Sequence, residues 1–226
     1  MTQVYVVVEG QTEESFVNAV LAPKLEYRGV YLRPKLLGTS GHRGGNVNYS
    51  RVKRDVTTLL KQNKQAYCTT LIDLYGLGPG FPGTAADPSR IAGDKASQIA
   101  QAIKEDIIAT LGDNSRADIR FMPYIQQYEF EGLPFSDPAA LAKGISQRQL
   151  ASRFQEVRAA FATPEDINNS PQTAPSKRIL QIYSSYQKPL HGVLAAKAMG
   201  LDIIRRECPR FKAWVSKLEA LAESAP

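Results

Sequence analysis

The order of apolar and polar positions at the start of the chain predicts a strand, a tight turn and a helix. Residues 2–9 contain a continuous run of valine and tyrosine, which is typical of a parallel strand buried on both faces. Thr12 can cap the next segment, and apolar residues recur from there to Leu25 at helical spacing. We therefore expect a central strand followed by a helix over residues 12–25.

Strand-like apolar runs and apolar residues at helical spacing recur as far as residue 131, and glycine-rich loops at 38–45 and 76–83 separate them. Further helices are predicted over 52–60 and from near Pro88 to 111, and further strands over 67–72 and 119–125, the last extending toward 131. This alternation predicts an α/β fold with a parallel sheet covered by helices on both faces.

The pattern changes beyond Pro138, where only helices are predicted. They cover residues 139–143, 147–161, 177–186, 189–199 and, as a last pair, 201–221. Residues 162–176 are rich in Pro, Asn, Ser and Thr and favour a flexible linker or lid. We expect an α/β domain over 1–138 and an all-helical C-terminal extension over 139–226 packed on it.

Composition limits the class of protein. With 226 residues, of which 43% are hydrophobic, the chain can bury a sizeable core. The longest aliphatic or aromatic run is Val4 to Val8, far below the roughly 20 residues that cross a bilayer, and no export signal opens the chain. Two cysteines and two histidines at wide spacing disfavour a disulfide framework and a zinc site. We expect a cytoplasmic protein with no membrane partner.

The net charge of +6 is unevenly distributed, because residues 176–217 hold nine basic residues against two acidic ones. Such a segment is either a solvated helical surface or a surface that binds polyanions, and both interpretations stay open. If it binds nucleic acid, the candidates are Lys177, Arg178, Lys188, Arg205 and Arg206.

Four carboxylates follow the predicted strands. Glu9 ends the first strand and Asp73 a later one, and the carboxyl ends of parallel strands meet at the crevice where ligands bind. Glu129 and Glu131 share one face if their segment is extended, with Phe130 on the other. Crowded carboxylates are typical ligands of Mg²⁺ or Mn²⁺. Taken singly, each acid could instead cap a helix or a loop, or lie on an exposed strand face.

Several common enzyme motifs are missing from the sequence. It contains no Gly-x-x-x-x-Gly-Lys-Ser/Thr loop, no Gly-x-Gly-x-x-Gly after the first strand and no Gly-x-Ser-x-Gly turn. A P-loop nucleotide hydrolase, a Rossmann oxidoreductase and an α/β hydrolase are therefore disfavoured.

Two segments that contain the candidate acids Glu9 and Asp73 resemble those of a known fold. Val8-Glu9-Gly10-Gln11-Thr12-Glu13 after a hydrophobic strand and Ile72-Asp73 at the end of another are similar to the Toprim fold of topoisomerases, bacterial-type primases and the overcoming-lysogenization-defect nucleases. Over most of its length the chain resembles an uncharacterised bacterial family known as domain of unknown function 4276. The segments that carry this second resemblance are Glu9-Gly10-x-Thr12-Glu13, Ile72-Asp73-x-Tyr75-Gly76, Glu129-Phe130-Glu131 with Phe135-Ser136-Asp137-Pro138, and Pro175-Ser176-Lys177-Arg178.

The Toprim resemblance implies roles for individual residues. Glu9 would act as acid/base or metal ligand, and Asp73 would be the first residue of a Mg²⁺-binding Asp-x-Asp pair. Tyr75 stands where the second Asp is expected, and a neutral phenol is a poor Mg²⁺ ligand. Glu129 and Glu131 are the candidates for the remaining metal ligands, with Asp137 behind them, and Lys188 joins Glu9 and Asp73 as a catalytic candidate.

We expect a Mg²⁺- or Mn²⁺-dependent phosphodiester-cleaving enzyme that acts on nucleic acid, and the resemblance implies anti-phage defence beside an ATPase partner. A second hypothesis is a non-catalytic Toprim-like scaffold that binds a partner, which Tyr75 favours. A third is a phosphoryl-transfer enzyme for a small substrate, against which the basic segment argues.

Overall fold

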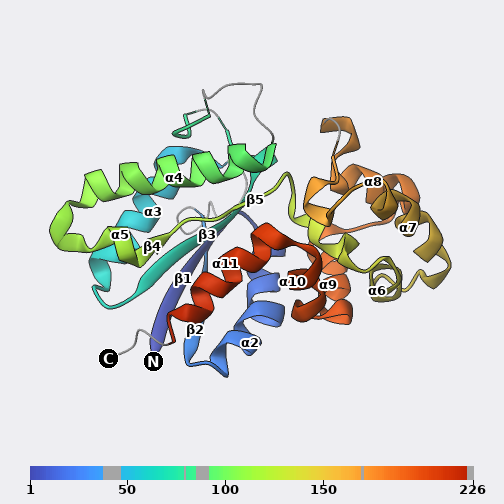
Figure 1. Ribbon diagram of the computed structural model, residues 1–226, viewed down its shortest axis with the longest axis horizontal. Helices are drawn as coiled ribbons and strands as arrows, with labels where there is room; N and C mark the ends of the chain where they lie inside the picture. Colours follow the sequence, from blue (N-terminus) through green and yellow to red (C-terminus); the bar gives the residue numbers. More distant parts are fainter. Residues whose placement is uncertain (38–46, 79, 85–91, 169–170, 223–226) are drawn as a thin grey trace.

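The structure is a computed structural model that describes residues 1–37, 47–78, 80–84, 92–168 and 171–222. At its centre is a parallel sheet in the order β2-β1-β3-β4, with β5 also paired with β3 (Figure 1). The strands are β1 (Thr2–Val8), β2 (Val30–Leu36), β3 (Tyr67–Asp73), β4 (Phe121–Met122) and β5 (Ile125–Gln126). Together with its helical cover, this sheet confirms the α/β class that the sequence predicts.

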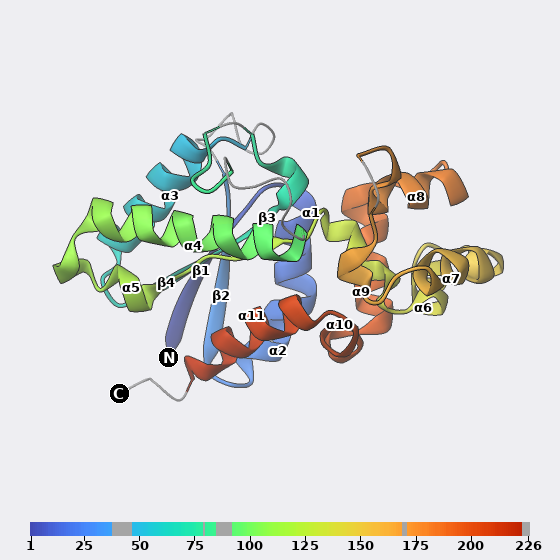
Figure 2. The same cartoon turned by 45° about the horizontal axis from the view of Figure 1, so that its top comes forward.

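Two helical layers cover the sheet (Figure 2). Val7, Cys68 and Ile72 point into a core shared with α3 (Tyr49–Gln62) and α4 (Ala92–Leu111). Val4, Val6 and Val8 point into a second core on the other face. That face is covered by α1 (Gln11–Phe16), a π-helix over Val17–Leu21, α2 (Ala22–Glu26) and α11 (Pro209–Ala220). The first strand therefore alternates between two cores, as its nearly continuous apolar run predicts.

The strand β2 has no counterpart in the sequence prediction. It pairs with the whole of β1, from Thr2 opposite Val30 to Val8 opposite Leu36. It lies at the edge of the sheet, where Pro34 can be tolerated although proline donates no ladder hydrogen bond.

The strand predicted from Ile119 to 131 is wrong in most of its length. Residues Ala117–Arg120 form the short helix α5, β4 and β5 are separated by two residues that include Pro123, and Phe130–Ser136 form a 3-10 helix. The buried Arg120 side chain donates hydrogen bonds to the carbonyls of Leu60, Asn63, Ala66 and Ser115. These bonds fix a helical turn where the apolar pattern predicts an extended chain.

The helices predicted beyond Pro138 are present. They are α6 (Pro138–Gly144), α7 (Ala151–Ala159), α8 (Pro175–Ile182), α9 (Val193–Met199), α10 (Leu201–Glu207) and α11. A π-helix over Lys188–Gly192 precedes α9, and further 3-10 turns cover Leu74–Gly76, Asp113–Ser115, Arg148–Leu150, Pro164–Asp166 and Pro171–Thr173. Among the described residues, no helix is long and apolar enough to span a membrane.

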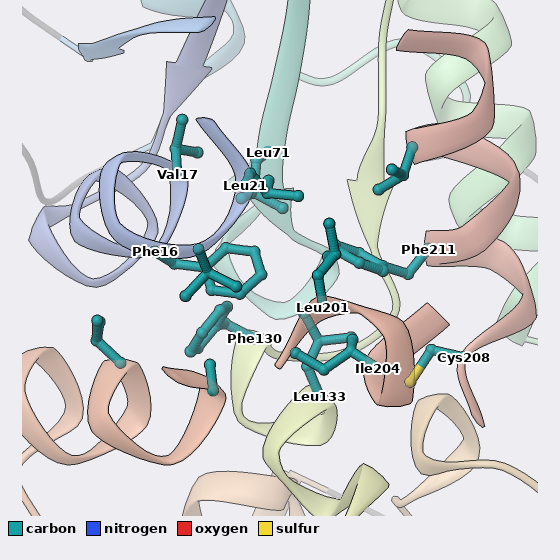
Figure 3. Close-up of a cluster of buried hydrophobic side chains, with 14 of the residues drawn as sticks. Phe16, Val17, Leu21, Leu71, Phe130, Leu133, Leu201, Ile204, Cys208 and Phe211 are labelled. Carbon is teal, nitrogen blue, oxygen red and sulfur yellow. The ribbon is translucent and has the colours of Figure 1, made fainter. Parts of the chain in front are cut away.

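The aromatic core links the sheet to the C-terminal helices (Figure 3). Phe16 contacts Phe130 edge to face with ring centroids 5.0 Å apart, and Phe211 at 6.0 Å. In the middle of α11, Trp214 donates its indole N–H to Thr69 Oγ1 at 2.8 Å. The last helix therefore lies directly on the sheet, while the domain boundary at residue 138 stays a prediction.

The flexible linker predicted over 162–176 is wrong for the residues described there. Glu165 and Ile167 are buried, and the Glu165 carboxylate accepts the N–H groups of Arg210 and Phe211, each at 2.9 Å. The segment therefore caps the start of α11 and packs against the core. Residues 169–170, the whole of the predicted loop at 38–45, and the predicted helix start near Pro88 lie outside the described residues.

Candidate functional site

Glu9 and Asp73 meet at the carboxyl end of the sheet. Glu9 directly follows β1, and Asp73 is the last residue of β3, the strand beside it. The backbone N–H of Asp73 donates to Glu9 Oε2 at 3.4 Å. Burial raises the pKa of Glu9, although this hydrogen bond opposes the rise. The parallel pairing of the two strands thus brings these acids to one edge.

Asp73 is held by a second backbone contact. Its Oδ1 accepts the N–H of Phe130 at 2.9 Å, which ties the end of β3 to the 3-10 helix that carries Glu131. Burial raises the pKa of Asp73, and the charges of Glu13, Glu131 and Glu9 raise it further. Such a group holds its proton more tightly than an exposed aspartate.

Glu13 belongs to the same group, although its place in the sequence predicts no site role. It lies in the first turn of α1, and its Oε2 accepts the N–H of Gly10 at 2.9 Å. Burial raises the pKa of Glu13 to about 7, with contributions from the charges of Glu9 and Glu131. Its presence in the Glu-Gly-x-Thr-Glu segment is the one sequence signal that could have assigned it to the site.

Glu129 and Glu131 come together for a reason other than the one predicted. Only Glu129 is extended, because the 3-10 helix begins at Phe130, so the two acids do not share a strand face. Instead both face Lys188, whose Nζ lies 3.1 Å from Glu131 Oε2 and 3.6 Å from Glu129 Oε1. Glu129 Oε2 also accepts the N–H of Ser176 at 2.9 Å. We call Glu9, Glu13, Asp73, Glu129 and Glu131 the carboxylate cluster.

Lys188 supplies positive charge to the carboxylate cluster from the π-helix before α9. Burial alone would lower the pKa of Lys188, but the charges of Glu131, Glu129 and Asp73 outweigh it and hold the pKa above its ordinary value. Glu131 is 1% exposed in its side chain, whereas Lys188 is 46% exposed. The lysine therefore reaches a buried carboxylate from the solvent side.

The hydroxyl of Tyr186 lies beside these acids. It is buried, and within the described chain it has no hydrogen-bond partner. Burial raises the pKa of Tyr186, as do the charges of Glu131 and Glu129. A buried phenol that keeps its proton is a hydrogen-bond donor, so Tyr186 can donate to a group that enters the cluster.

Metal binding needs a closer arrangement of the acids than this. Within the described residues, no three Asp, Glu, His or Cys side chains stand in a group that could hold a metal ion. Asp137, expected behind Glu129 and Glu131, caps α6 by accepting the N–H of Ala140. Mg²⁺ or Mn²⁺ therefore stays a prediction, and Lys188 supplies positive charge to the cluster.

Tyr75 lies next to the cluster and packs against another tyrosine. Its ring centroid is 5.4 Å from that of Tyr128, its backbone N–H donates to the Tyr128 carbonyl, and its hydroxyl is hydrogen-bonded to Asn168. Tyr128 has a positive φ of 57°, which is uncommon for a residue with a side chain. The position where the resemblance leads one to expect an aspartate is thus part of an aromatic contact.

The basic residues expected to bind nucleic acid are mostly engaged within the chain. Arg205 binds Glu219 through two nitrogens at 2.7 and 2.8 Å, and Arg206 pairs with Glu207 at 2.9 Å. Arg178 donates to the Thr173 carbonyl and lies over the ring of Phe161, while Lys177 is exposed. Their role in binding nucleic acid stays a prediction.

Comparison with known proteins adds a family and a structural likeness. The family described as domain of unknown function (DUF4276) matches residues 8–219. The chain is also similar to the C-terminal region of the OLD protein of Xanthomonas campestris pv. campestris, with 12% sequence identity, a TM-score of 0.45 and coverage of 99% of this chain and 97% of that one. A likeness at this TM-score does not establish a shared activity. No protein of curated function matches the sequence.

Proposed function

The chain belongs to the family described as domain of unknown function (DUF4276), and we propose that it is a divalent-metal-dependent protein that cleaves phosphodiesters in nucleic acid. The observation that carries this proposal is the carboxylate cluster at the carboxyl end of the parallel sheet, which gathers around Lys188. Ligands bind at this end of open α/β sheets.

By chemical type, although not by their present spacing, the carboxylates suit a hard divalent cation. Carboxylate oxygens are the ligands that Mg²⁺ and Mn²⁺ prefer, and crowded carboxylates need a compensating charge. The buried Tyr186 hydroxyl, which has no partner among the described residues, leaves a donor for a further polar group. Glu9, Asp73 and Glu131 would hold the ion, with Glu129 as a further ligand, after these side chains move closer together and Lys188 turns toward solvent.

Each residue of the site then has a defined task. When bound, the ion supplies positive charge for the attacking and leaving oxygens of a phosphodiester. Lys188, released from Glu129 and Glu131, can contact a phosphate oxygen, because nearly half of its side chain already faces solvent. Glu13, with a pKa of about 7, can accept or donate a proton near neutral pH.

A second candidate function is a non-catalytic module that binds a partner. The observation in its favour is that Lys188 already compensates Glu129 and Glu131, while Asp73 is bonded to the N–H of Phe130. Each of these three acids therefore has a partner without an ion. An ATPase partner and a role in anti-phage defence are compatible with both candidates and stay proposals.

Cleavage assays test the two candidates against each other. Labelled single-stranded and duplex DNA and RNA are incubated with wild type in Mg²⁺, Mn²⁺ or EDTA, and with Asp73→Asn, Glu131→Gln and the control Glu156→Gln. Glu156 is exposed on α7, away from the cluster. The enzyme proposal expects cleavage that needs metal, survives Glu156→Gln and falls at least about 100-fold in the two cluster variants. Absent cleavage together with absent Mn²⁺ binding would support the partner-binding module.

A further inference from the structure

A cavity that contains no residue of the carboxylate cluster lies between two helices at the edge of the sheet. It has a volume of about 400 Å³ and is bordered by α4 on one side and α11 on the other, with residues 122–125 of the β4 and β5 segment between them. We call this cavity the α4–α11 groove. Its lining shares no residue with the cluster.

The groove carries positive charge. Lys104 from α4 and Arg210 and Lys217 from α11 line it, and among the residues that the structure describes its lining contains no carboxylate. Arg210 lies 3.5 Å from Asp166, but no ion pair joins Lys104 or Lys217 to any carboxylate within the described parts of the chain. Two lysines that lack a counter-ion and face one cavity create a field that attracts an anion.

Two aromatic residues that line the groove are held in place by stacking and hydrogen bonds. Trp214 stacks on Tyr124 with ring centroids 4.6 Å apart and planes at 10°, and both rings are anchored by hydrogen bonds, to Thr69 and to Gln126. A ligand would therefore meet a cavity that is already formed, which lowers the entropic cost of binding.

The lining of the groove follows both helices for about two turns. On α11 its lining extends from Arg210 to Lys217, about 10 Å at 1.5 Å per residue. A volume of about 400 Å³ lies near the lower end of roughly 300–1,000 Å³ for ligand sites, which suits a short stretch of one strand and is too small for a duplex. Cations spaced along such a lining suit a chain of phosphates.

The register of the sheet brings one end of the groove close to the cluster. Ile125, which lines the groove, pairs with Ile72, and the next pair joins Gln126 to Asp73. At this end the groove lining is therefore one residue pair from an acid of the cluster.

We propose that the α4–α11 groove binds the phosphate backbone of a single strand of nucleic acid and directs it toward the carboxylate cluster. The direction toward the cluster rests on the proposed function, whereas binding in the groove does not. The basic surface that matters is then on α4 and α11, in place of the ion-paired Arg205 and Arg206.

The test measures binding of a fluorescent 12-nucleotide strand in EDTA, where metal-dependent cleavage cannot occur. The double variant Lys104→Gln/Lys217→Gln is compared with Lys61→Gln/Lys64→Gln, which removes the same charge from exposed positions at the end of α3 and just after it. For single strands, log K falls with log salt by about 0.7 per phosphate contact, so losing two contacts lowers the slope by about 1.4 and weakens binding about 25-fold at 0.1 M salt. The control pair should change neither quantity.

A second variant keeps the test independent of lysine packing. Ala213 is an exposed residue of the groove lining on α11, so Ala213→Glu adds a negative charge to the groove without filling the core. It should weaken strand binding at least about tenfold while the melting temperature stays at the wild-type value.

Three outcomes would overturn the proposal. They are a wild type that does not bind the strand in EDTA, groove variants that bind as tightly as the control, and a preference for duplex or for adenosine monophosphate over the strand. Groove-dependent binding by a protein that never cleaves would instead uphold the groove and defeat the enzyme proposal. If the groove variants still cleave and bind the strand with unchanged affinity, the groove proposal is wrong and the enzyme proposal stands.

Discussion

A Cβ atom on Gly76 would lie 2.2 Å from Oε2 of Glu9, so the Glu9 carboxylate rests directly against the backbone of residue 76. Gly76 closes the 3-10 turn Leu74–Gly76 that follows β3, and Glu9 follows the neighbouring strand β1. The missing side chain leaves the space in which Glu9 accepts the N–H of Asp73. The glycine therefore determines where the first acid of the cluster can lie.

We expect Gly76→Ala to move Glu9 without unfolding the protein. The atoms in conflict are the terminal atoms of a side chain, which can rotate away, so the free energy of unfolding should change by less than about 1 kcal/mol. Mn²⁺ affinity, measured by calorimetry, should fall at least about tenfold. Gly10→Ala is the matched control, because its Cβ meets Glu13 Oε2 at an ordinary 3.4 Å. Equal Mn²⁺ affinity in the two variants would mean that Glu9 is not a ligand of the metal.

The metal-free protein should lose stability as the pH rises from about 5 to 8. The pKa of Glu13 is raised from 4.5 to about 7, and the pKa values of Glu9, Asp73 and Glu131 are also raised. In this window the folded protein retains protons that the unfolded chain has released, so stability falls with pH. Lys188, whose pKa is also raised, stays protonated in both states and adds no slope here.

Urea unfolding in EDTA at pH 5.5 and pH 8.0 measures this effect. A tenfold change in proton affinity is worth about 1.4 kcal/mol, so Glu13 alone should contribute about 1 to 3 kcal/mol to the difference. Glu13→Gln keeps an acceptor for the N–H of Gly10 and should flatten the dependence. A wild type that becomes more stable toward pH 8 would contradict the proposed protonation of the cluster.

Two substitutions of Asp73 should have opposite effects on stability at pH 8 without metal. Asp73→Asn keeps an oxygen for the N–H of Phe130 and removes a charge that Glu13, Glu131 and Glu9 oppose, so the melting temperature should stay equal or rise. Asp73→Ala leaves that buried N–H without its partner and should cost about 1–3 kcal/mol. If asparagine proves as damaging as alanine, the charge of Asp73 stabilises the fold.

Glu165 should be a structural residue, because its carboxylate accepts two N–H groups at the start of α11. Glu165→Ala should lower the free energy of unfolding by about 1–3 kcal/mol, and Glu165→Gln, which retains one acceptor, by less. Glu156→Ala, at an exposed position of α7, serves as the comparison in the same urea titration. A fully stable Glu165→Ala protein would mean that residues 164–168 contribute little to the fold.

The elements that the sequence predicts well are those with one strong period. The valine run of β1 and the isoleucines of α4, Ile99, Ile103 and Ile107, are buried as their spacing requires. The edge strand β2 escapes prediction because Arg33, Pro34 and Lys35 interrupt its apolar pattern. An edge strand buries less of its surface than a central one, so its sequence carries a weaker signal.

The segment near residue 120 misleads for a different reason. Ile119 fits a strand pattern by type, yet it lies 49% exposed on α5, because the bonds of the buried Arg120 to four backbone carbonyls set the local turn. The burial of Arg120 depends on hydrogen bonds to carbonyls that are mostly distant in the sequence, so no local sequence pattern indicates it. Tertiary contacts override the propensity of the segment.

The site follows the same division between local and distant signals. Glu9 and Asp73 are predictable neighbours, because both follow parallel strands. The contact of Lys188 with Glu131 joins residues 57 positions apart, and only the packing of the helices beyond Pro138 produces it. The site role of Glu13 cannot be predicted from the sequence, because an acid in the first turn of a helix is common and usually only stabilises that helix.

The hydrogen bond from Trp214 to Thr69 joins residues 145 positions apart and places α11 on the face of the sheet. At about 5–20 residues per second, the ribosome completes β3 well before it has synthesised α11. This face of the sheet therefore lacks its covering helix for part of synthesis. During that interval apolar strand surface is exposed to other chains. The apolar surface around Thr69 therefore stays uncovered until α11 has been synthesised and Trp214 can dock on it.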